Sequence, residues 1–327
     1  QYQKENDIMK ILVLAPLQQE NLQKIEQSFP NINFIFSSNQ TVTQEMIDDC
    51  DVIVGNPSFQ FNLNKENLQA ILLNSAGSDE YVKKGILHPH TILTNASGTY
   101  GKAIAEHTIG MILMLNKNLK TYAYHMKDHL WRPLLTGKEL YKSTVVIVGL
   151  GDLGYELAKR LKAFDCKIIG IKRTLSPLPK DIDELYTTKD LNQVLPRADF
   201  IITALPQTKE TIHLFNKERF SLMKKDAVFI NIGRGSAVNT QDLQEALESG
   251  HFFGVGLDVV EEEPLPENSA LWDFDNTIIT PHASGGYVWN SARQYYTDLV
   301  IRNIHHILNH EQLENEVDFQ TGYRKTV

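Results

Sequence analysis

Short apolar runs alternate with amphipathic segments along most of this chain, starting at Lys10. The runs are rich in Val, Ile and Leu, as strands buried on both faces of a parallel sheet are, and the segments between them place apolar residues at helical spacing. This alternation predicts an α/β fold in which crossover helices join parallel strands. We predict strands at residues 11–15, 34–36, 52–54, 71–74, 92–94, 144–148, 168–171, 199–206, 227–232, 254–259 and 276–280.

The helical segments predict how these strands are divided into domains. Residues 103–116 are apolar nearly all round, which indicates a buried helix that links two domains. The last segment, 291–308, is long enough to return to the first domain, so we expect the second domain to be inserted into a discontinuous first one. Further helices are predicted at 20–29, 43–48, 63–68, 157–164, 190–195, 220–223 and 240–249.

The resulting prediction is two doubly wound parallel-sheet domains. A Rossmann-type domain, 98–287, is inserted into a flavodoxin-like domain, 9–97 and 288–320. Residues 1–8 are polar and precede Met9, so we interpret them as a leader or tag remnant and leave them out of the fold.

A glycine-rich turn follows the predicted strand at 144–148 and opens the next helix, with the sequence Gly-Leu-Gly-Asp-Leu-Gly. Gly149 permits a tight turn, Gly151 lets the backbone approach a pyrophosphate, and Gly154 lets the helix pack against the strand. The free N–H groups of the first helical turn would then face the phosphates. Because the turn lies in a strand-turn-helix-strand context, it predicts a dinucleotide site.

The end of the second strand of this unit bears on the choice of cofactor. An acidic residue there would hydrogen-bond the adenosine ribose, but the chain has Lys172, Arg173 and Thr174 instead. Two cations and a hydroxyl attract a 2′-phosphate, which favours NADP over NAD. The alternative is a solvated basic strand end with relaxed cofactor choice, so NAD remains possible.

Composition argues against several classes of function, such as binding of nucleic acid or insertion into a membrane. The 327 residues suit two domains, and a net charge of -8 argues against nucleic acid as a partner. Cys50 and Cys166 have no metal or redox spacing and indicate reduced thiols in a cytoplasmic protein. No apolar run is long enough to predict a membrane span. His306 and His310 have helical spacing without an apparent third ligand, so we predict no metal site.

Three loops after predicted strands hold ionisable side chains. Arg234 lies between two glycines after an apolar strand, where it could clamp a carboxylate; the alternative is a structural salt bridge. Glu263, fixed beside a proline, could turn inward toward a histidine or stay solvated with its glutamate neighbours. His282 lies in a small-residue loop, where a structural role is the alternative to catalysis. The loop at 74–79 could offer backbone N–H groups to a carboxylate.

These motifs together resemble a known family. The run 149–154, the Asn-x-Gly-Arg-Gly at Asn231, the Asp-Val-x-x-x-Glu-Pro-Leu-Pro from Asp258 and the Thr-Pro-His at Thr280 are similar to signatures of the NAD(P)-dependent D-isomer-specific 2-hydroxyacid dehydrogenases. The resemblance covers the inserted domain in order and the first domain more loosely.

The resemblance implies a role for individual residues. Arg234 would bind the substrate carboxylate and polarise the carbonyl, His282 would be the acid/base, and Glu263 would hydrogen-bond that histidine and favour its protonated form. Backbone of Ala76 and Gly77 would meet the substrate carboxylate. The cofactor would contact Asp152 and Leu153 at its pyrophosphate, Lys172, Arg173 and Thr174 at its adenosine, Leu205, Pro206 and Thr211 along its length, and Ile232 and Asp258 near its nicotinamide.

The expected function is reduction of a small 2-oxo acid, such as glyoxylate, hydroxypyruvate or a branched 2-ketoacid, to the D-2-hydroxy acid. One alternative in the same family is a 3-phosphoglycerate dehydrogenase. Another is a dinucleotide-sensing binding protein on the same scaffold, similar to the C-terminal-binding corepressors. The apolar helix at 103–116 and the segment around Trp131 would suit the interface of a homodimer.

Overall fold

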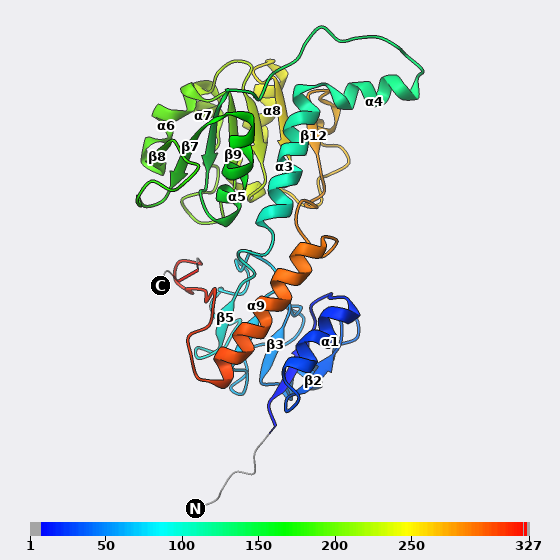
Figure 1. The fold of residues 1–327 in the computed structure, drawn as a ribbon, viewed down its shortest axis with the longest axis vertical. Coiled ribbons are helices and arrows are strands. Elements are labelled where there is room, and N and C mark those ends of the chain that lie inside the picture. Colours follow the sequence, from blue (N-terminus) through cyan, green and yellow to red (C-terminus); the bar gives the residue numbers. More distant parts are fainter. Residues whose placement is uncertain (1–7, 323, 326–327) are drawn as a thin grey trace, which may run out of the picture. The chain divides into compact units, whose positions relative to one another are not determined.

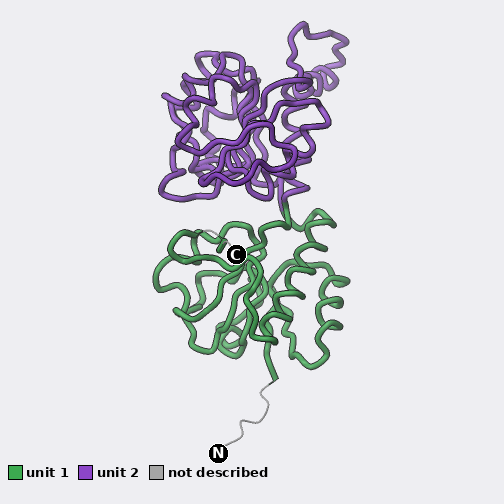
Figure 2. Tube along the Cα trace, turned by 60° about the vertical axis from the view of Figure 1, so that its left-hand side comes forward, with its two compact units in different colours: residues 1–100, 286–327 green, residues 101–285 purple. Residues whose placement is uncertain are grey.

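The computed structural model describes residues 8–322, 324 and 325. The chain forms two compact units, one made of Gln1–Tyr100 and Gly286–Val327 and the other of Gly101–Gly285 (Figure 2). The units therefore divide at 100 and 286, where the sequence had predicted domain boundaries at 97 and 288. Except for Ile8, the predicted leader lies outside the described residues.

Unit 1 is built on a five-stranded sheet with the order β2-β1-β3-β4-β5. Every strand pair in it is parallel, and this order is the flavodoxin-like one. The strands are β1 (Lys10–Val13), β2 (Asn33–Phe36), β3 (Val52–Val54), β4 (Ala70–Leu72) and β5 (Ile92–Thr94), and the helices are α1 (Gln19–Ser28), α2 (Gln44–Asp48) and α9 (Asn290–Leu308).

The last helix, α9, returns to unit 1 and lies beside α1 (Figure 1). The ring centroids of Phe29 and His305 are 4.6 Å apart, and Lys24 pairs with Asp298 at 2.6 Å. The Tyr296 hydroxyl donates to the carbonyl of Leu72 at 2.8 Å, which ties α9 to the sheet. These contacts make unit 1 discontinuous in sequence, as the long final helix had suggested.

Unit 2 contains a seven-stranded sheet with the order β12-β11-β10-β9-β6-β7-β8. All of its pairs are parallel, and the first six strands follow the Rossmann order, with β12 added at one edge. The two parallel α/β sheets confirm the predicted fold class. The strands are β6 (Thr144–Val148), β7 (Lys167–Lys172), β8 (Glu184–Thr187), β9 (Phe200–Thr203), β10 (Val228–Asn231), β11 (Gly254–Leu257) and β12 (Thr277–Ile279).

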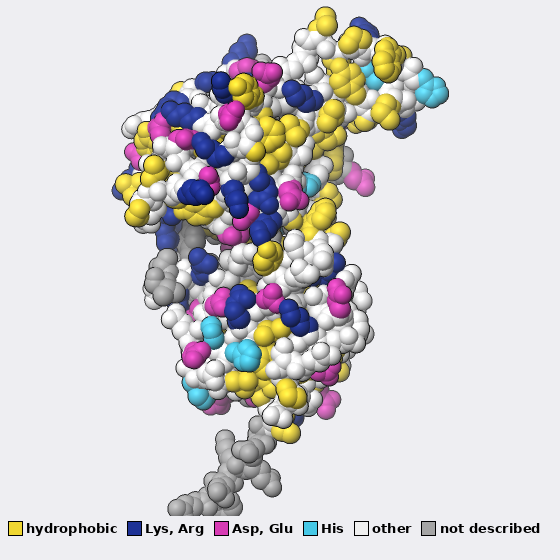
Figure 3. Space-filling model, in the orientation of Figure 1, with side chains coloured by type: hydrophobic (Ala, Val, Ile, Leu, Met, Phe, Trp, Pro, Cys, Tyr) yellow, Lys and Arg dark blue, Asp and Glu magenta, His cyan; other side chains and the backbone are white. Residues whose placement is uncertain are grey.

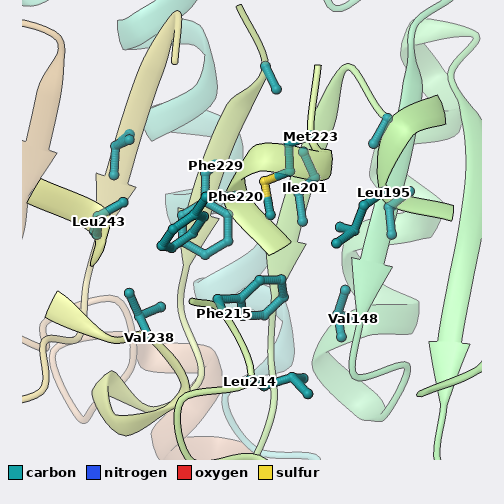
Figure 4. Packing of buried hydrophobic residues seen from close by; sticks show 14 of the residues in the cluster. Val148, Leu195, Ile201, Leu214, Phe215, Phe220, Met223, Phe229, Val238 and Leu243 are labelled. Carbon is teal, nitrogen blue, oxygen red and sulfur yellow. The ribbon is translucent and has the colours of Figure 1, made fainter. Parts of the chain in front are cut away.

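Alternate side chains of these strands enter two separate cores. Val146 and Val148 of β6 belong to a cluster with residues of α6 (Leu191–Val194), α7 (Lys217–Leu222) and α8 (Thr240–Glu248), part of which Figure 4 shows. Val145 and Ile147 belong to a second cluster on the opposite face, with α3 (Gly101–Asn116) and α5 (Asp152–Leu161). Burial on both faces explains why these strands are continuous apolar runs.

The helix predicted at 63–68 is wrong, because the segment forms turns. Polar side chains compete with helical hydrogen bonds there: the Asn64 amide donates to the Asn62 side chain at 3.0 Å, and the Asn67 side chain donates to the carbonyls of Asp48 and Cys50. The sequence also gave no indication of β8 or of α4 (Leu119–Lys127), which are short and not continuously apolar.

Helix α4 and the chain after it, up to residue 137, form an arm on unit 2. None of the α4 side chains is buried. Met126, Trp131 and Leu135 are 78%, 102% and 98% exposed, which is unusual for large apolar residues. The arm extends from the body of unit 2 in Figure 1, and Figure 3 shows apolar side chains gathered on it. No helix among the described residues has the length and apolar character needed to cross a membrane.

Candidate active site

The three loops with the predicted catalytic groups leave one edge of the unit 2 sheet. Asn231, Leu257 and Ile279 end β10, β11 and β12 and are neighbours in the strand register. The Asp258 amide donates to the Asn231 carbonyl at 3.0 Å, and the Thr280 amide donates to the Leu257 carbonyl at 2.9 Å. The loops of Arg234, Glu263 and His282 therefore start from a single row of the sheet.

His282 and Glu263 form a hydrogen-bonded pair. Nδ1 of His282 lies 2.8 Å from Oε2 of Glu263, and the two side chains are 50% and 39% exposed. Nε2 of His282 has no hydrogen-bond partner among the residues that the structure describes. His282 has a φ of +51°, a left-handed conformation that is uncommon outside glycine and is often found at functional sites. The pair thus leaves one imidazole nitrogen available for proton transfer.

Asp258 fixes the loop around His282. Its carboxylate is buried and accepts hydrogen bonds from the Thr280 hydroxyl at 2.6 Å, from the Ala283 amide at 2.9 Å and from the amide and hydroxyl of Ser284. These donors precede and follow His282 in the sequence, so the buried Asp258 carboxylate fixes the backbone conformation of the loop around His282. The predicted nicotinamide contact of Asp258 would be made by a carboxylate that already has several partners.

Arg234 lies in a tight loop that is fixed at its backbone. The Asn231 side chain donates to the Arg234 carbonyl at 3.0 Å and accepts from the Gly233 amide at 3.2 Å. A Cβ on Gly235 would lie 1.7 Å from the Val260 carbonyl oxygen. The Arg234 loop and the loop after β11 are therefore in direct backbone contact, which explains the glycine after the arginine.

The predicted dinucleotide turn has the geometry that its glycines suggested. Gly149 has a φ of +102°, and a Cβ on it would lie 2.6 Å from the Ala204 carbonyl oxygen. A Cβ on Gly154 would lie 2.7 Å from the Gly149 carbonyl oxygen. A Cβ on Gly151 would meet open space, and no side chain caps α5, which begins at Asp152 and Leu153. Open space in front of uncapped amides fits a phosphate group.

The basic residues predicted at the adenosine lie where β7 ends. Lys172 is its last residue, and its Nζ lies 3.2 Å from the Tyr155 hydroxyl and 3.3 Å from Ser176 Oγ. Arg173 and Thr174 follow in the exposed loop. Since Tyr155 belongs to α5, Lys172 lies beside the helix that starts at the glycine turn.

The remaining predicted cofactor residues line the ends of β9 and β10. Leu205 and Ile232 are buried, whereas Pro206 is exposed. The Thr211 hydroxyl donates to the Pro206 carbonyl at 2.8 Å and accepts from the Thr208 amide at 2.8 Å, so it closes the turn between them. Its observed role is local, and a dinucleotide contact stays a prediction.

The predicted substrate-binding loop belongs to unit 1 and follows β4. Its carbonyl groups are taken up by the protein: Ser75 O accepts from the Ala96 amide at 2.9 Å, Ala76 O from the Asn95 side chain at 3.0 Å, and Gly77 O from the Ser75 hydroxyl at 2.6 Å. The amides of Ala76 and Gly77 have no partner among the described residues. The loop thus keeps donors, but not acceptors, available for an anion.

A family model agrees with this geometry. Residues 109–284 match the model described as D-isomer specific 2-hydroxyacid dehydrogenase, NAD binding domain. The chain belongs to this family. A glyoxylate reductase from Thermofilum pendens is 38% identical over 75% of this chain and 73% of its own length. A D-3-phosphoglycerate dehydrogenase from Methanocaldococcus jannaschii is 32% identical over 95% of this chain and 60% of its own length.

Solved structures of the family have the same fold as this chain. A family protein from Aeromonas salmonicida superposes with a TM-score of 0.86 at 29% identity, covering 95% of this chain and 99% of the other. An NADPH-dependent glyoxylate/hydroxypyruvate reductase from Sinorhizobium meliloti, in complex with NADP and sulfate, has a TM-score of 0.81 at 27% identity, covering 96% and 100%.

Sequence reasoning missed the tyrosines that hold the predicted substrate loop. The Asn74 carbonyl accepts hydrogen bonds from the hydroxyls of Tyr100 and, at 3.1 Å, Tyr287. Burial raises the pKa of Tyr100 to about 12 and that of Tyr287 well above its ordinary value, so both hydroxyls remain donors. Tyr100 ends the first segment of unit 1 and Tyr287 opens the second, and no local motif marks either residue.

His107 is a second residue whose surroundings only the structure reveals. Its Nε2 lies 3.1 Å from the Thr280 hydroxyl, which in turn donates to Asp258, so α3 supports the loop of His282. Among the described residues of this dehydrogenase, no three His, Cys, Asp or Glu side chains converge where they could hold a metal ion.

Proposed function

We propose that this dehydrogenase reduces a small 2-oxo acid to the corresponding D-2-hydroxy acid, and catalyses the reverse reaction, with His282, Glu263 and Arg234 as its reactive groups. The hydrogen bond between Nδ1 of His282 and Glu263 is the observation that carries the proposal. It fixes the orientation of the ring and directs Nε2 away from Glu263, so that this nitrogen can exchange a proton with a substrate.

The proton chemistry follows from this pair. Reduced nicotinamide, when bound, supplies a hydride to the carbonyl carbon of the substrate. His282 donates its Nε2 proton to the carbonyl oxygen, and Glu263 holds the imidazole in place through Nδ1 during that transfer. Arg234 binds the substrate carboxylate and offsets the negative charge that develops on the carbonyl oxygen. In unit 1, the unpartnered amides of Ala76 and Gly77 are the proposed substrate-binding donors.

Several observations support a small 2-oxo acid as the substrate. The relatives from Thermofilum pendens and Pyrococcus furiosus are named glyoxylate reductases, and that from Sinorhizobium meliloti is named a glyoxylate/hydroxypyruvate reductase. The relative named D-3-phosphoglycerate dehydrogenase makes a phosphorylated substrate the second candidate. Turnover of a phosphorylated 2-oxo acid distinguishes the two candidate functions, because only a phosphoglycerate dehydrogenase requires a site for a substrate phosphate.

NADP is the proposed preferred cofactor, with NAD as a possible second. The support is the charge at the end of β7, where Lys172 and Arg173 replace the carboxylate that would repel a 2′-phosphate. The Sinorhizobium meliloti structure contains NADP, which is consistent with this preference.

A homodimer that uses the α4 arm is also part of the proposal. The exposed Met126, Trp131 and Leu135 would be covered by the same unit of a second copy, which would remove them from water. Cys50 and Cys166 are both free and buried, as expected for reduced thiols in the cytoplasm.

The test measures oxidation of NADPH and NADH with glyoxylate, hydroxypyruvate, pyruvate, 2-ketoisocaproate and phosphohydroxypyruvate. We expect NADPH-dependent turnover with the small acids and a fall of about 100-fold in kcat/KM for Arg234→Lys, because lysine lacks the bidentate fork. Lys172→Ala should raise KM for NADPH about tenfold, since a charge-assisted contact is worth roughly 1.5–3 kcal/mol. Lys225→Ala, at an exposed lysine of unit 2 away from the end of β7, is the control.

Each other outcome has a distinct meaning. Turnover with phosphohydroxypyruvate alone would favour the phosphoglycerate dehydrogenase. NADH-only turnover would overturn the cofactor preference and leave the reaction in place. Tight dinucleotide binding without turnover of any acid would contradict the enzyme and favour a dinucleotide-sensing protein.

A further inference from the structure

The loop that presents Glu263 begins at Asp258 and contains a second carboxylate, Glu261. Oε1 of Glu263 accepts a hydrogen bond from the Val260 amide at 3.2 Å, while its Oε2 is hydrogen bonded to His282. Glu261 does not face His282. Its carboxylate turns to the other side, toward two segments that are distant in sequence.

Both carboxylate oxygens of Glu261 are engaged. Oε1 is hydrogen bonded to Nε2 of His213, and Oε2 accepts from the Thr240 amide at 3.1 Å and the Thr240 hydroxyl at 2.8 Å. Burial raises the pKa of Glu261, but the hydrogen bonds from His213 and Thr240 outweigh it and hold that pKa below its usual value. The carboxylate is therefore charged at neutral pH and binds two separate segments at once.

The two partners connect the loop to the rest of the active-site edge. Thr240 is the first residue of α8. The His213 amide donates to the Ser236 carbonyl at 2.8 Å, and Ser236 belongs to the short helix that follows Arg234. Glu261 thus links the loop of Glu263 to the segment that carries Arg234, through His213.

A hollow borders one side of this loop. A hollow of about 300 Å³ lies behind the loop, lined by Val260, Glu262, Leu265 and Pro266 together with Glu261 and Thr240. Val260 and Leu265 pack against the hydrophobic core of unit 2, so this packing and the hydrogen bonds of Glu261 act on the loop together. The hydrogen bonds of the Glu261 carboxylate join this loop to His213 and Thr240.

We propose that Glu261 is a positioning residue, which holds the Glu263 loop against the Arg234 segment through His213 and Thr240 and thereby sets the Glu263–His282 pair. The inference rests on the proposed reductase function for its kinetic consequence. Its structural part, the link between loop and segment, holds for any function of this edge.

The experiment compares Glu261→Ala, Glu261→Gln and the neighbouring control Glu262→Ala in the full chain. Glu262 is exposed and makes no hydrogen bond or ion pair among the described residues. Glu261→Ala should lower kcat about tenfold with KM for NADPH unchanged, because a loop shift below 1 Å misplaces the acid/base pair without touching the glycine turn. Glu261→Gln should recover most of kcat, since the amide can accept from Thr240 and donate to a neutral His213.

A second variant breaks the same link from its other end. His213 has a φ of +49°, so His213→Asn is chosen because asparagine tolerates this conformation and its side chain is too short to reach Glu261. His213→Asn should reproduce the loss in kcat. The double variant with Glu261→Ala should be no slower than either single variant, as expected for two residues that act through one contact.

Hydrogen–deuterium exchange separates this proposal from the proposed function. The amides of 258–263 should exchange faster in Glu261→Ala and His213→Asn than in the wild type or Glu262→Ala. If the wild type reduces none of the acids but this exchange difference is found, the proposed function fails and the link stands. Unchanged exchange, or an equal kcat for Glu261→Ala and Glu262→Ala in an active enzyme, would overturn the proposal.

Discussion

Gly235 offers a sharp test of how closely the active-site loops depend on one another. Its absent Cβ would lie 1.7 Å from the carbonyl oxygen of Val260 and 2.6 Å from the Glu261 amide nitrogen. Gly235→Ala therefore forces the Arg234 loop and the Glu263 loop apart. The clash is with backbone atoms, so no side-chain rotation can relieve it.

The size of the effect follows from these distances. A carbon and an oxygen atom in ordinary contact are separated by more than about 3 Å, so the two loops must separate by roughly 1.5 Å. Overpacking of this kind costs about 1–3 kcal/mol of unfolding free energy. A displacement of about 1 Å between reacting groups can lower the rate about 100-fold. We therefore expect a modest loss of stability and a large loss of kcat.

The assay measures urea unfolding and saturating NADPH-dependent turnover for Gly235→Ala. Gly110→Ala is the matched control, because its Cβ meets nothing within 4 Å on helix α3. Alanine in place of a helical glycine should raise the unfolding free energy by about 0.5–1 kcal/mol without affecting kcat. A Gly235→Ala enzyme with wild-type kcat would refute the idea that contact between the two loops positions the reactive groups.

Two further variants test the substrate loop and the arm. Burial raises the pKa of Tyr100 from 10.0 to about 12. The contribution of its neutral hydroxyl to the unfolding free energy is therefore present below pH 10 and is lost as pH rises toward 12. Between pH 10 and 12, the unfolding free energy should fall less for Tyr100→Phe than for the wild type. Trp131→Asp should turn the proposed dimer into a monomer in light scattering, because it places a charge at a fully exposed apolar position of the arm; a dimer that persists would place the interface elsewhere.

The regular parts of the fold were predictable because each strand is buried on both faces. The run at 144–148 became β6 without change of bounds, and the glycine turn after it was recognisable from spacing alone. At 63–68 apolar spacing favoured a helix, but asparagine side chains formed turns instead. Local pattern gave the wrong element there because side-chain hydrogen bonds to the backbone compete with helix formation.

The loops of the candidate reactive groups could be located from the sequence, since each loop follows an apolar strand. The residues that hold these loops in place could not be predicted from the sequence. Glu261 was interpreted as part of a solvated run of glutamates, yet its partners His213 and Thr240 lie far away in sequence. Tyr287 reaches the Asn74 carbonyl from the other end of the chain. Such pairs arise from tertiary folding, so no spacing rule within one segment can reveal them.

Unit 2 is a single continuous segment of the chain, which affects how substrate specificity can change in evolution. The residues proposed for proton transfer and cofactor binding all fall within Gly101–Gly285, whereas the donor loop at 74–77 belongs to unit 1. The chain passes between the units only after Tyr100 and after Gly285. Recombination at these two junctions would exchange the proposed substrate loop as one module and leave the proposed reactive groups together in unit 2, so a new substrate could be acquired by replacing a unit.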